Sequence, residues 1–259
     1  MPTLTRAGYD INYQLTGPAR APLLLLSNSL GADLTMWDDQ VREFSKSFRV
    51  LRYDNRGHGA STAPKAPCSL EDVASDAAAL IEMTREKAAH FCGLSLGGMV
   101  GMWLATHRPH LINRLVLCNT SALLGPPQNW ETRIHAVRNG GMQAVVNAVI
   151  ARWFTEPFRA HCPNVVGLVE QSFLNVSVEG YVGCCAAIRD MDQRQDIAAI
   201  QAVTLVVAGT HDPATPPAMN QEIASSIKGA RYAELPAAHL SNIEAASSFN
   251  DVVGHFLRA

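Results

Sequence analysis

The 259-residue sequence lacks the features that mark several classes of protein. No apolar run approaches membrane-spanning length, and the clearest one, Leu23–Leu26, is only as long as a strand. The first residues, Met1–Arg6, have neither the basic nor the apolar region of a secretory leader. Charged residues make up only 17% of the chain, the net charge is −2, and no basic run is present. We therefore expect no membrane partner and no nucleic-acid partner.

The cysteines also exclude possibilities by their spacing. None of the six has the spacing of zinc ligands, and no group of residues suggests another metal. Cys92 and Cys118 fall inside apolar runs of strand length, which favours buried thiols. We therefore expect six reduced cysteines, no bound metal and a cytoplasmic location.

What the sequence does contain is an alternation of short apolar runs with longer amphipathic stretches. Hydrophobic residues make up 47% of the chain, enough for a large buried core. This alternation predicts an α/β fold with a mostly parallel central sheet flanked by helices. The expected strands are residues 3–5, 11–15, 22–26, 49–53, 88–92, 115–118, 204–208 and 232–235.

The pattern changes between residues 121 and 200, where strand-like runs nearly disappear. Amphipathic stretches punctuated by Pro and Gly take their place, as expected of helices joined by turns. We expect these helices over residues 130–137, 142–154, 165–173 and 181–189. The sequence thus predicts an α/β core formed by residues 1–120 and 201–259, with residues 121–200 inserted as a helical cap.

A short segment, Gly93-Leu94-Ser95-Leu96-Gly97-Gly98, carries the clearest chemical signal. It reads G-x-S-x-G, follows an apolar run of strand length and precedes a helical one, which is the context of a nucleophile elbow. Small residues at Gly93 and Gly97 suit such a turn, because side chains there would collide with adjacent elements. Ser95 is therefore the candidate nucleophile, although a lone serine in this position can also simply cap a helix.

A serine nucleophile needs a base and an orienting carboxylate. Asp212 comes after one late predicted strand and His239 after the last, in the chain order Ser, acid, His. Each residue alone has an ordinary explanation, Asp212 as a turn residue and His239 as a surface loop residue. Their joint placement after predicted strands favours a catalytic triad of Ser95, Asp212 and His239.

The oxyanion of the tetrahedral intermediate needs backbone donors. We expect one from the amide of Leu96, directly after the nucleophile, and one from Leu30 in the loop after the strand 22–26. A plain turn over residues 27–31 is the alternative. A further Gly-rich loop, residues 54–61, lacks the lysine of a phosphate cradle, so we interpret Asp54 and Arg56 as braces for the end of the sheet.

Nearly the whole chain resembles the 3-oxoadipate enol-lactonases of the α/β-hydrolase superfamily. The superfamily often has His-Gly before the oxyanion donor, and Asn28-Ser29 stands there in this chain. The segment around Cys184-Cys185 and the Pro-rich turn after Asp212 are more particular to the lactonases than the elbow is. The segments that carry the resemblance are residues 27–31, 52–59, 90–99, 115–120, 183–190, 208–217 and 237–244.

The resemblance implies hydrolysis of 3-oxoadipate enol-lactone to 3-oxoadipate through an acyl-enzyme, in the breakdown of protocatechuate and catechol. It implies no cofactor, and a stand-alone enzyme rather than one fused to a decarboxylase. A monomer or small homo-oligomer is expected. The alternatives are a general carboxylesterase or cofactor-free perhydrolase on the same fold, or a non-catalytic ligand receptor.

The implied substrate is a small lactone that carries a carboxylate, which calls for a cation in the site. Arg133, one turn from Trp130 on an expected cap helix, is the candidate, with Trp130 and Trp153 as walls around the ring. The alternative is ordinary: an arginine on an amphipathic helix is usually solvated, and tryptophans of a cap usually pack the cap itself.

Overall fold

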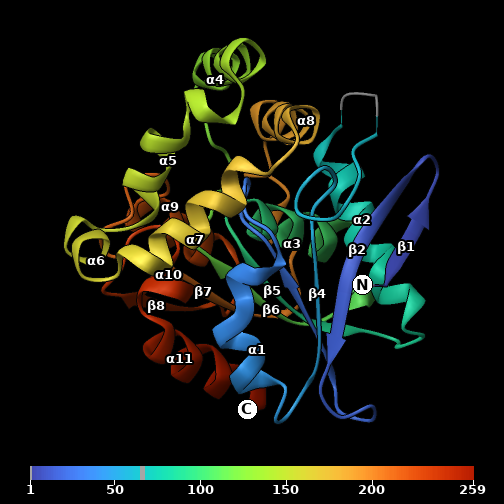
Figure 1. Cartoon of the computed structure of the whole chain (residues 1–259). Helices are drawn as coiled ribbons and strands as arrows, with labels where there is room; N and C mark the ends of the chain where they lie inside the picture. The colour runs from blue at the N-terminus through green and yellow to red at the C-terminus, as the bar shows by residue number, and fades with distance from the viewer. Residues whose placement is uncertain (1, 65–67) are drawn as a thin grey trace.

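An eight-stranded sheet forms the centre of the computed structural model, which describes residues 2–64 and 68–259 (Figure 1). The strand order is β1-β2-β4-β3-β5-β6-β7-β8. β2 runs antiparallel to both β1 and β4, and all other neighbours are parallel. The predicted fold class is therefore confirmed. The strands are β1 (Thr3–Arg6), β2 (Tyr9–Thr16), β3 (Leu23–Ser27), β4 (Arg49–Tyr53), β5 (Ala89–Leu94), β6 (Ile112–Cys118), β7 (Val203–Gly209) and β8 (Arg231–Leu235).

The central strands are mostly apolar because helices cover both faces of the sheet. Every residue of β3 and β5 is buried. The register aligns the carboxyl ends of the parallel strands: Ser27 lies opposite Gly93, and Leu94 opposite Cys118. Farther along the sheet, Gly209 lies opposite Leu235. Residues that directly follow β3, β5, β6, β7 and β8 are thus delivered to one edge.

The helices of the core form groups on the two faces of the sheet (Figure 1). α1 (Asp38–Phe44) packs against α11 (Ala246–Arg258), and α2 (Leu70–Met83) packs against α3 (Leu96–His107). α9 (Pro217–Ser226) packs on β7 and β8.

Two expected helix boundaries in the core differ from the structure. The sequence predicts a helix that begins with a capping box of Ser69 and Asp72 and runs to about Glu86. The capping box is present at the start of α2, but the helix ends at Met83. The sequence also predicts one terminal helix over residues 243–257. The structure divides it into α10 (Ser241–Glu244) and α11, because Ala245 leaves the helical conformation.

Between β6 and β7 the chain forms five α-helices and no strand within residues 121–200. They are α4 (Pro127–Gly140), α5 (Val146–Trp153), α6 (Glu156–His161), α7 (Pro163–Leu174) and α8 (Val178–Asp190). The stretch 142–154 contains a 3₁₀ turn before α5, which shortens the expected helix. The expectation missed α6, a six-residue helix that buries none of its side chains and so has no apolar periodicity.

All six cysteines are free thiols. Among the described residues, no helix combines the length and the apolar character needed to cross a membrane.

Candidate active site

Ser95 lies on a strained turn between β5 and α3. Its backbone has φ 57° and ψ −114°, a conformation that non-glycine residues rarely adopt. The turn is tight on both sides: a Cβ at Gly93 would collide with the carbonyl of Gly97, and one at Gly97 with that of Ser27. The expected need for small residues is confirmed. Hydrogen bonds to Cys118 O (2.9 Å) and from the Thr120 hydroxyl (2.8 Å) fix the backbone of Ser95.

Asp212 and His239 meet as the sequence predicts. The Nδ1 of His239 lies 2.8 Å from Oδ2 of Asp212, and both side chains are almost fully buried. Burial alone would raise the pKa of Asp212, but the charge and hydrogen bond of His239 outweigh burial, with further hydrogen bonds from Asn119 and Thr215. The pKa therefore lies below its usual value, and the group stays a carboxylate. Its five donors are Ala214 N, Thr215 N, Thr215 Oγ1, Asn119 Nδ2 and His239 Nδ1.

Asn119, which sequence reasoning missed, joins the segments that carry these two residues. It directly follows β6 with φ 44°, and its Nδ2 donates to Asp212 Oδ2 (2.9 Å) and to Ala238 O (3.2 Å). Its Oδ1 accepts from the Ser241 hydroxyl at 2.6 Å. The available signal was a polar residue placed directly after a buried strand, at the edge of the sheet that also carries Ser95.

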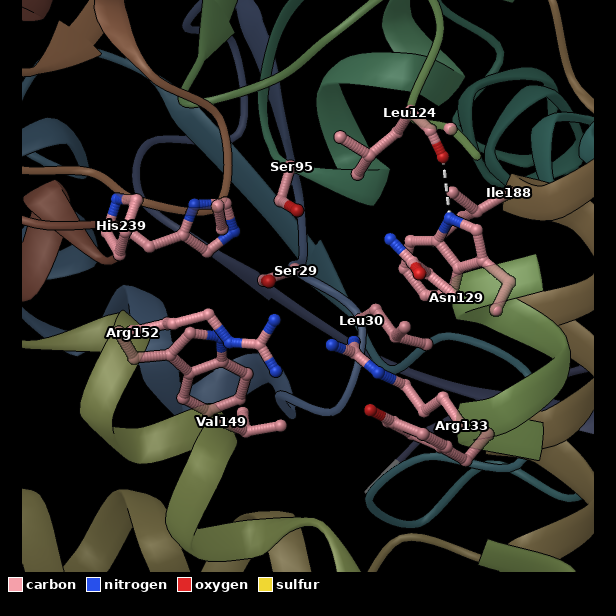
Figure 2. Close-up of a pocket in the computed structure, with 16 residues that line it drawn as sticks. Ser29, Leu30, Ser95, Leu124, Asn129, Arg133, Val149, Arg152, Ile188 and His239 are labelled. Carbon is pink, nitrogen blue, oxygen red and sulfur yellow. Dashed lines mark hydrogen bonds between the residues drawn. The ribbon is translucent and has the colours of Figure 1, made fainter. Parts of the chain in front are cut away.

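Ser95 and His239 line one cavity of about 240 Å³, which lies between the sheet edge and the inserted helices (Figure 2). Figure 2 shows the serine hydroxyl and the imidazole projecting into this space from the core. The volume suits a small molecule, whereas drug-sized ligands commonly occupy cavities of about 300–1,000 Å³. The lining residues are Ser29, Leu30, Ser95, Leu124, Gly125, Asn129, Trp130, Arg133, Val149, Arg152, Trp153, Tyr181, Ile188, Pro213, Ala214 and His239.

The two backbone amides expected to bind an oxyanion belong to rigid segments beside Ser95. Leu30 lines the cavity, and Leu96 is the first residue of α3. Neither N–H donates to another group of the part of the chain that the structure describes. Next to them, Gly97 N donates to Asn28 O at 3.0 Å, which ties the loop after β3 to the elbow. Two unpaired donors at a helix start and an adjacent loop suit a developing negative charge.

His58, on the Gly-rich loop, supports the segment that carries Leu30. Its Nδ1 lies 3.0 Å from the carbonyl of Arg56, so this nitrogen bears the proton, and its Nε2 accepts from Gly31 N at 3.0 Å. Burial lowers the pKa of His58 to about 4, which keeps the ring neutral near pH 7.

Two other residues of this loop, Asp54 and Arg56, support the sheet edge, as expected from the sequence. Asp54 accepts from Asn12 Nδ2 and from Leu34 N, each at 2.7 Å, and Arg56 forms an ion pair with Asp76 of α2 at 2.8 Å.

Two arginines reach the cavity from the inserted helices. Arg133 comes from α4, as the sequence predicts, and Arg152, which sequence reasoning missed, comes from α5. Figure 2 shows both guanidinium groups directed into the same space. The lining contains no Asp or Glu, and neither arginine pairs with a carboxylate of the described residues. Burial and the charge of Arg133 lower the pKa of Arg152, so this part of the cavity concentrates positive charge.

The predicted tryptophans also lie in this cavity. Trp130 donates its indole N–H to Leu124 O at 2.6 Å, and the guanidinium of Arg133 lies 4.9 Å from its ring centroid. Trp153 is buried, lines the cavity and packs edge-on against Phe173. The inserted helices thus supply an aromatic wall as well as the two positive charges.

Comparison with known proteins points to one family. The family model described as alpha/beta hydrolase fold matches residues 22–246. A 3-oxoadipate enol-lactonase of Acinetobacter baylyi is 37% identical over 251 residues, which cover 97% of this chain and 94% of that protein. The crystal structure of an enol-lactonase from Burkholderia xenovorans superposes with a TM-score of 0.98 at 43% identity, with full coverage of both chains. A thermophilic esterase from Thermogutta terrifontis, solved with malate bound, has a TM-score of 0.93 at 26% identity, with 100% of this chain and 98% of that one covered.

Proposed function

The chain belongs to the α/β-hydrolase family, and on that basis we propose that it hydrolyses 3-oxoadipate enol-lactone to 3-oxoadipate. One observation carries the proposal: a single cavity holds Ser95 and His239 on the side of the sheet and two arginines without carboxylate partners on the side of the helices. A substrate that fills it needs an ester carbonyl at one end and an anionic group at the other. The names of the relatives at 37% and 43% identity agree with that chemistry.

In the first step of the proposed mechanism, Ser95 attacks the carbonyl carbon of the lactone while His239 takes the hydroxyl proton. The amides of Leu30 and Leu96 donate to the oxygen that becomes negative. Asp212, held ionised by its five donors, fixes the imidazole and stabilises its protonated form. The ring C–O bond then breaks, and the enol oxygen leaves with the proton returned by His239.

In the second step, His239 takes a proton from water, and the hydroxide formed attacks the acyl-enzyme ester. The tetrahedral intermediate collapses, and Ser95 regains its proton from His239. The freed enol tautomerises to the ketone, which makes the ring opening favourable overall. Arg133 and Arg152 hold the carboxylate of the substrate through charge-assisted hydrogen bonds, with Trp130 and Trp153 against the ring.

We assign residues 121–200 the role of a cap that closes the site from above, with residues 1–120 and 201–259 as the catalytic core. The proposed triad and oxyanion donors all come from this core, and the proposed anion-binding residues come from the cap. A cytoplasmic location and a monomer or small homo-oligomer stay predictions.

The test is the loss of the ultraviolet absorbance of the enol-lactone with purified wild type and with Ser95→Ala. We expect rapid hydrolysis by wild type and a loss of kcat of about 10⁴-fold or more in the variant. Activity that survives in Ser95→Ala would show that the elbow is not the catalytic centre.

A panel of uncharged aryl esters and a fluorophosphonate probe separate the alternatives. Equal efficiency on bulky neutral esters and on the lactone would favour a general carboxylesterase. Labelling of Ser95 without lactone hydrolysis would keep the hydrolase and discard the lactone. Absence of labelling would favour a ligand receptor.

A further inference from the structure

We propose that Glu244 is a positioning residue through which an anion bound at Arg152 controls the placement of His239. The inference rests on the proposed function for the identity of the anion, the carboxylate of the lactone. Glu244 is the last residue of α10, five positions after His239, and it is not among the residues that line the cavity.

The carboxylate of Glu244 bridges the loop of His239 and the segment that follows α5. Its Oε2 accepts a hydrogen bond from Ala238 N at 2.9 Å. Its Oε1 accepts a hydrogen bond from the hydroxyl of Thr155. The backbone nitrogen of Thr155 lies 3.3 Å from both carboxylate oxygens. One side chain therefore joins the residue directly before His239 to a residue of the inserted helical region.

A backbone hydrogen bond makes the same connection on the other side of His239. Leu240 N donates to the carbonyl of Trp153 at 3.0 Å. Of the two chain neighbours of His239, Leu240 is thus bonded directly to the segment 153–155, and Ala238 is linked to it through the carboxylate of Glu244. The ring itself is fixed by Asp212, so the bonds on either side decide where the backbone of His239 lies relative to this segment.

Arg152 directly precedes that segment and extends into the cavity. It is the last but one residue of α5, and its neighbour Trp153 both lines the cavity and bonds the loop of His239. Thr155, which Glu244 contacts, is only three positions after Arg152, whose guanidinium receives the anion. A shift of α5 towards a bound carboxylate is therefore passed on to both sides of His239.

The free energy gained by binding the carboxylate therefore has two effects. Part of it lowers KM, and part moves His239 into the position that serves the transition state and so raises kcat. An enol-lactone without the carboxylate should react with a lower kcat even at saturation. This advantage of the anionic substrate should depend on Glu244.

The test compares kcat and KM for two lactones with the same reacting ring. One is 3-oxoadipate enol-lactone, and the other is 5-methylfuran-2(3H)-one, which has a methyl group in place of the carboxymethyl group. Glu244→Gln removes the negative charge and leaves one side-chain oxygen to accept, which weakens the bridge between Ala238 and Thr155 at nearly constant volume. We expect a kcat about tenfold lower on the anionic lactone, with KM and the kcat of the methyl lactone changed by less than about twofold.

A second variant and a control show whether Glu244 couples Arg152 to His239 or only supports the loop that carries His239. Arg152→Met should lower the ratio of the two kcat values as Glu244→Gln does, and the double variant should lower it little further, because both changes interrupt one connection. Asn250→Ala is the matched control: Asn250 is a half-buried polar residue of α11 that accepts a hydrogen bond from Gln40. It should change both rates by the same factor.

Three results would overturn the proposal. Equal losses on both lactones in Glu244→Gln would mean that Glu244 only supports the loop of His239. Unchanged rates would mean that neither link matters. Additive losses in the double variant would separate Arg152 from Glu244.

Failure of the proposed function gives a different result. A wild type that hydrolyses neither lactone rejects the lactonase assignment, and the same ratio is then measured with 4-nitrophenyl hydrogen adipate against 4-nitrophenyl hexanoate. Collapse of that ratio in Glu244→Gln supports the coupling for anionic esters in general. An unchanged ratio, or no hydrolysis of any of the four substrates, overturns it.

Discussion

The sheet edge and the inserted helices line the same cavity, but their polar groups differ in how far they are paired within the protein. At the sheet edge, Asp212 receives five hydrogen bonds, and the strained backbone of Ser95 is fixed from two sides. On the helices, Arg133 and Arg152 carry like charges into one space, with no carboxylate among the lining residues. The polar groups of the sheet edge named here are thus satisfied without a ligand. The positive charges of the two arginines are balanced only when an anionic ligand binds.

The difference has a physical origin in how each region is built. Parallel strands in fixed register bring their carboxyl ends to one edge, so side chains that follow them meet with little freedom. The helices are placed mainly by packing, and their polar connections to the loop of His239 run through few bonds, such as those of Thr155 and Leu240. We interpret the rigid region as the source of the reaction and the helical region as the source of substrate choice.

Asp212→Asn should have the largest effect on kcat, because it changes the hydrogen-bonded groups of the sheet edge that hold His239. A neutral amide cannot stabilise protonated His239, and its NH₂ group would face donors such as Thr215 Oγ1. We expect kcat to fall about 10⁴-fold on anionic and neutral substrates alike. Steady-state kinetics checks this, with the exposed Asp192→Asn as control. A loss below tenfold would remove Asp212 from the triad.

Arg152→Met should have a smaller effect, confined to anionic substrates. The loss of a charged hydrogen bond lowers kcat/KM for the carboxylated lactone by about 10- to 100-fold. The methyl lactone should change by less than about threefold, since it has no group for the arginine to bind. The melting temperature should stay constant or rise, because repulsion with Arg133 is relieved.

The control for this prediction is Arg138→Met on the exposed end of α4, which should alter neither rate. A comparable loss on the methyl lactone would contradict the division between the two regions. A fall in melting temperature would show that Arg152 stabilises the fold rather than serving only to bind a ligand.

The smallest expected effect is a pH dependence of the free energy of unfolding, which comes from two buried histidines of the core. His58 and His90 are buried, and burial lowers the pKa of each to about 4, below the ordinary value of 6.5. The unfolded chain therefore binds more protons between pH 6.5 and 4, so stability falls as the pH drops through this window. From pH 7 to 5 each histidine should remove about 2 kcal/mol from the free energy of unfolding.

Urea unfolding of wild type and His90→Leu at the two pH values measures this contribution. His90 is the better site to substitute, because its Nδ1 has no hydrogen-bond partner among the described residues, whereas His58 binds Gly31 and Arg56. The variant should lose about 2 kcal/mol less than wild type on acidification. An identical loss in both proteins would show that His90 is not protonated on unfolding in this range.

Local pattern was enough to predict the elements that carry Ser95, Asp212 and His239. A strand, a glycine-flanked serine and a helix are neighbours in the chain, so the elbow is visible in a few residues. The acid and the base follow predicted strands, and parallel strands leave little choice about where such residues meet. Arg152 was not predicted because its place in the cavity depends on how α5 packs in the folded chain, which no local pattern records.

Asn119 and Glu244 escaped for a related reason, distance along the chain. Asn119 bonds Asp212 across 93 positions, and Thr155 bonds Glu244 across 89. No periodicity connects residues so far apart. The helix α6 escaped because a surface helix without buried side chains leaves no apolar repeat.

The sequence by itself determined the α/β fold class, the strained turn at Ser95 and the order of the three polar residues at the sheet edge. These follow from local sterics and from hydrophobic patterns that repeat every two or three to four residues. Only the tertiary structure decided that Arg152 joins Arg133 in the cavity, and that the loop of His239 is bonded to the helices around it. Such contacts depend on how whole elements pack, which is set by the shape and burial of many side chains at once.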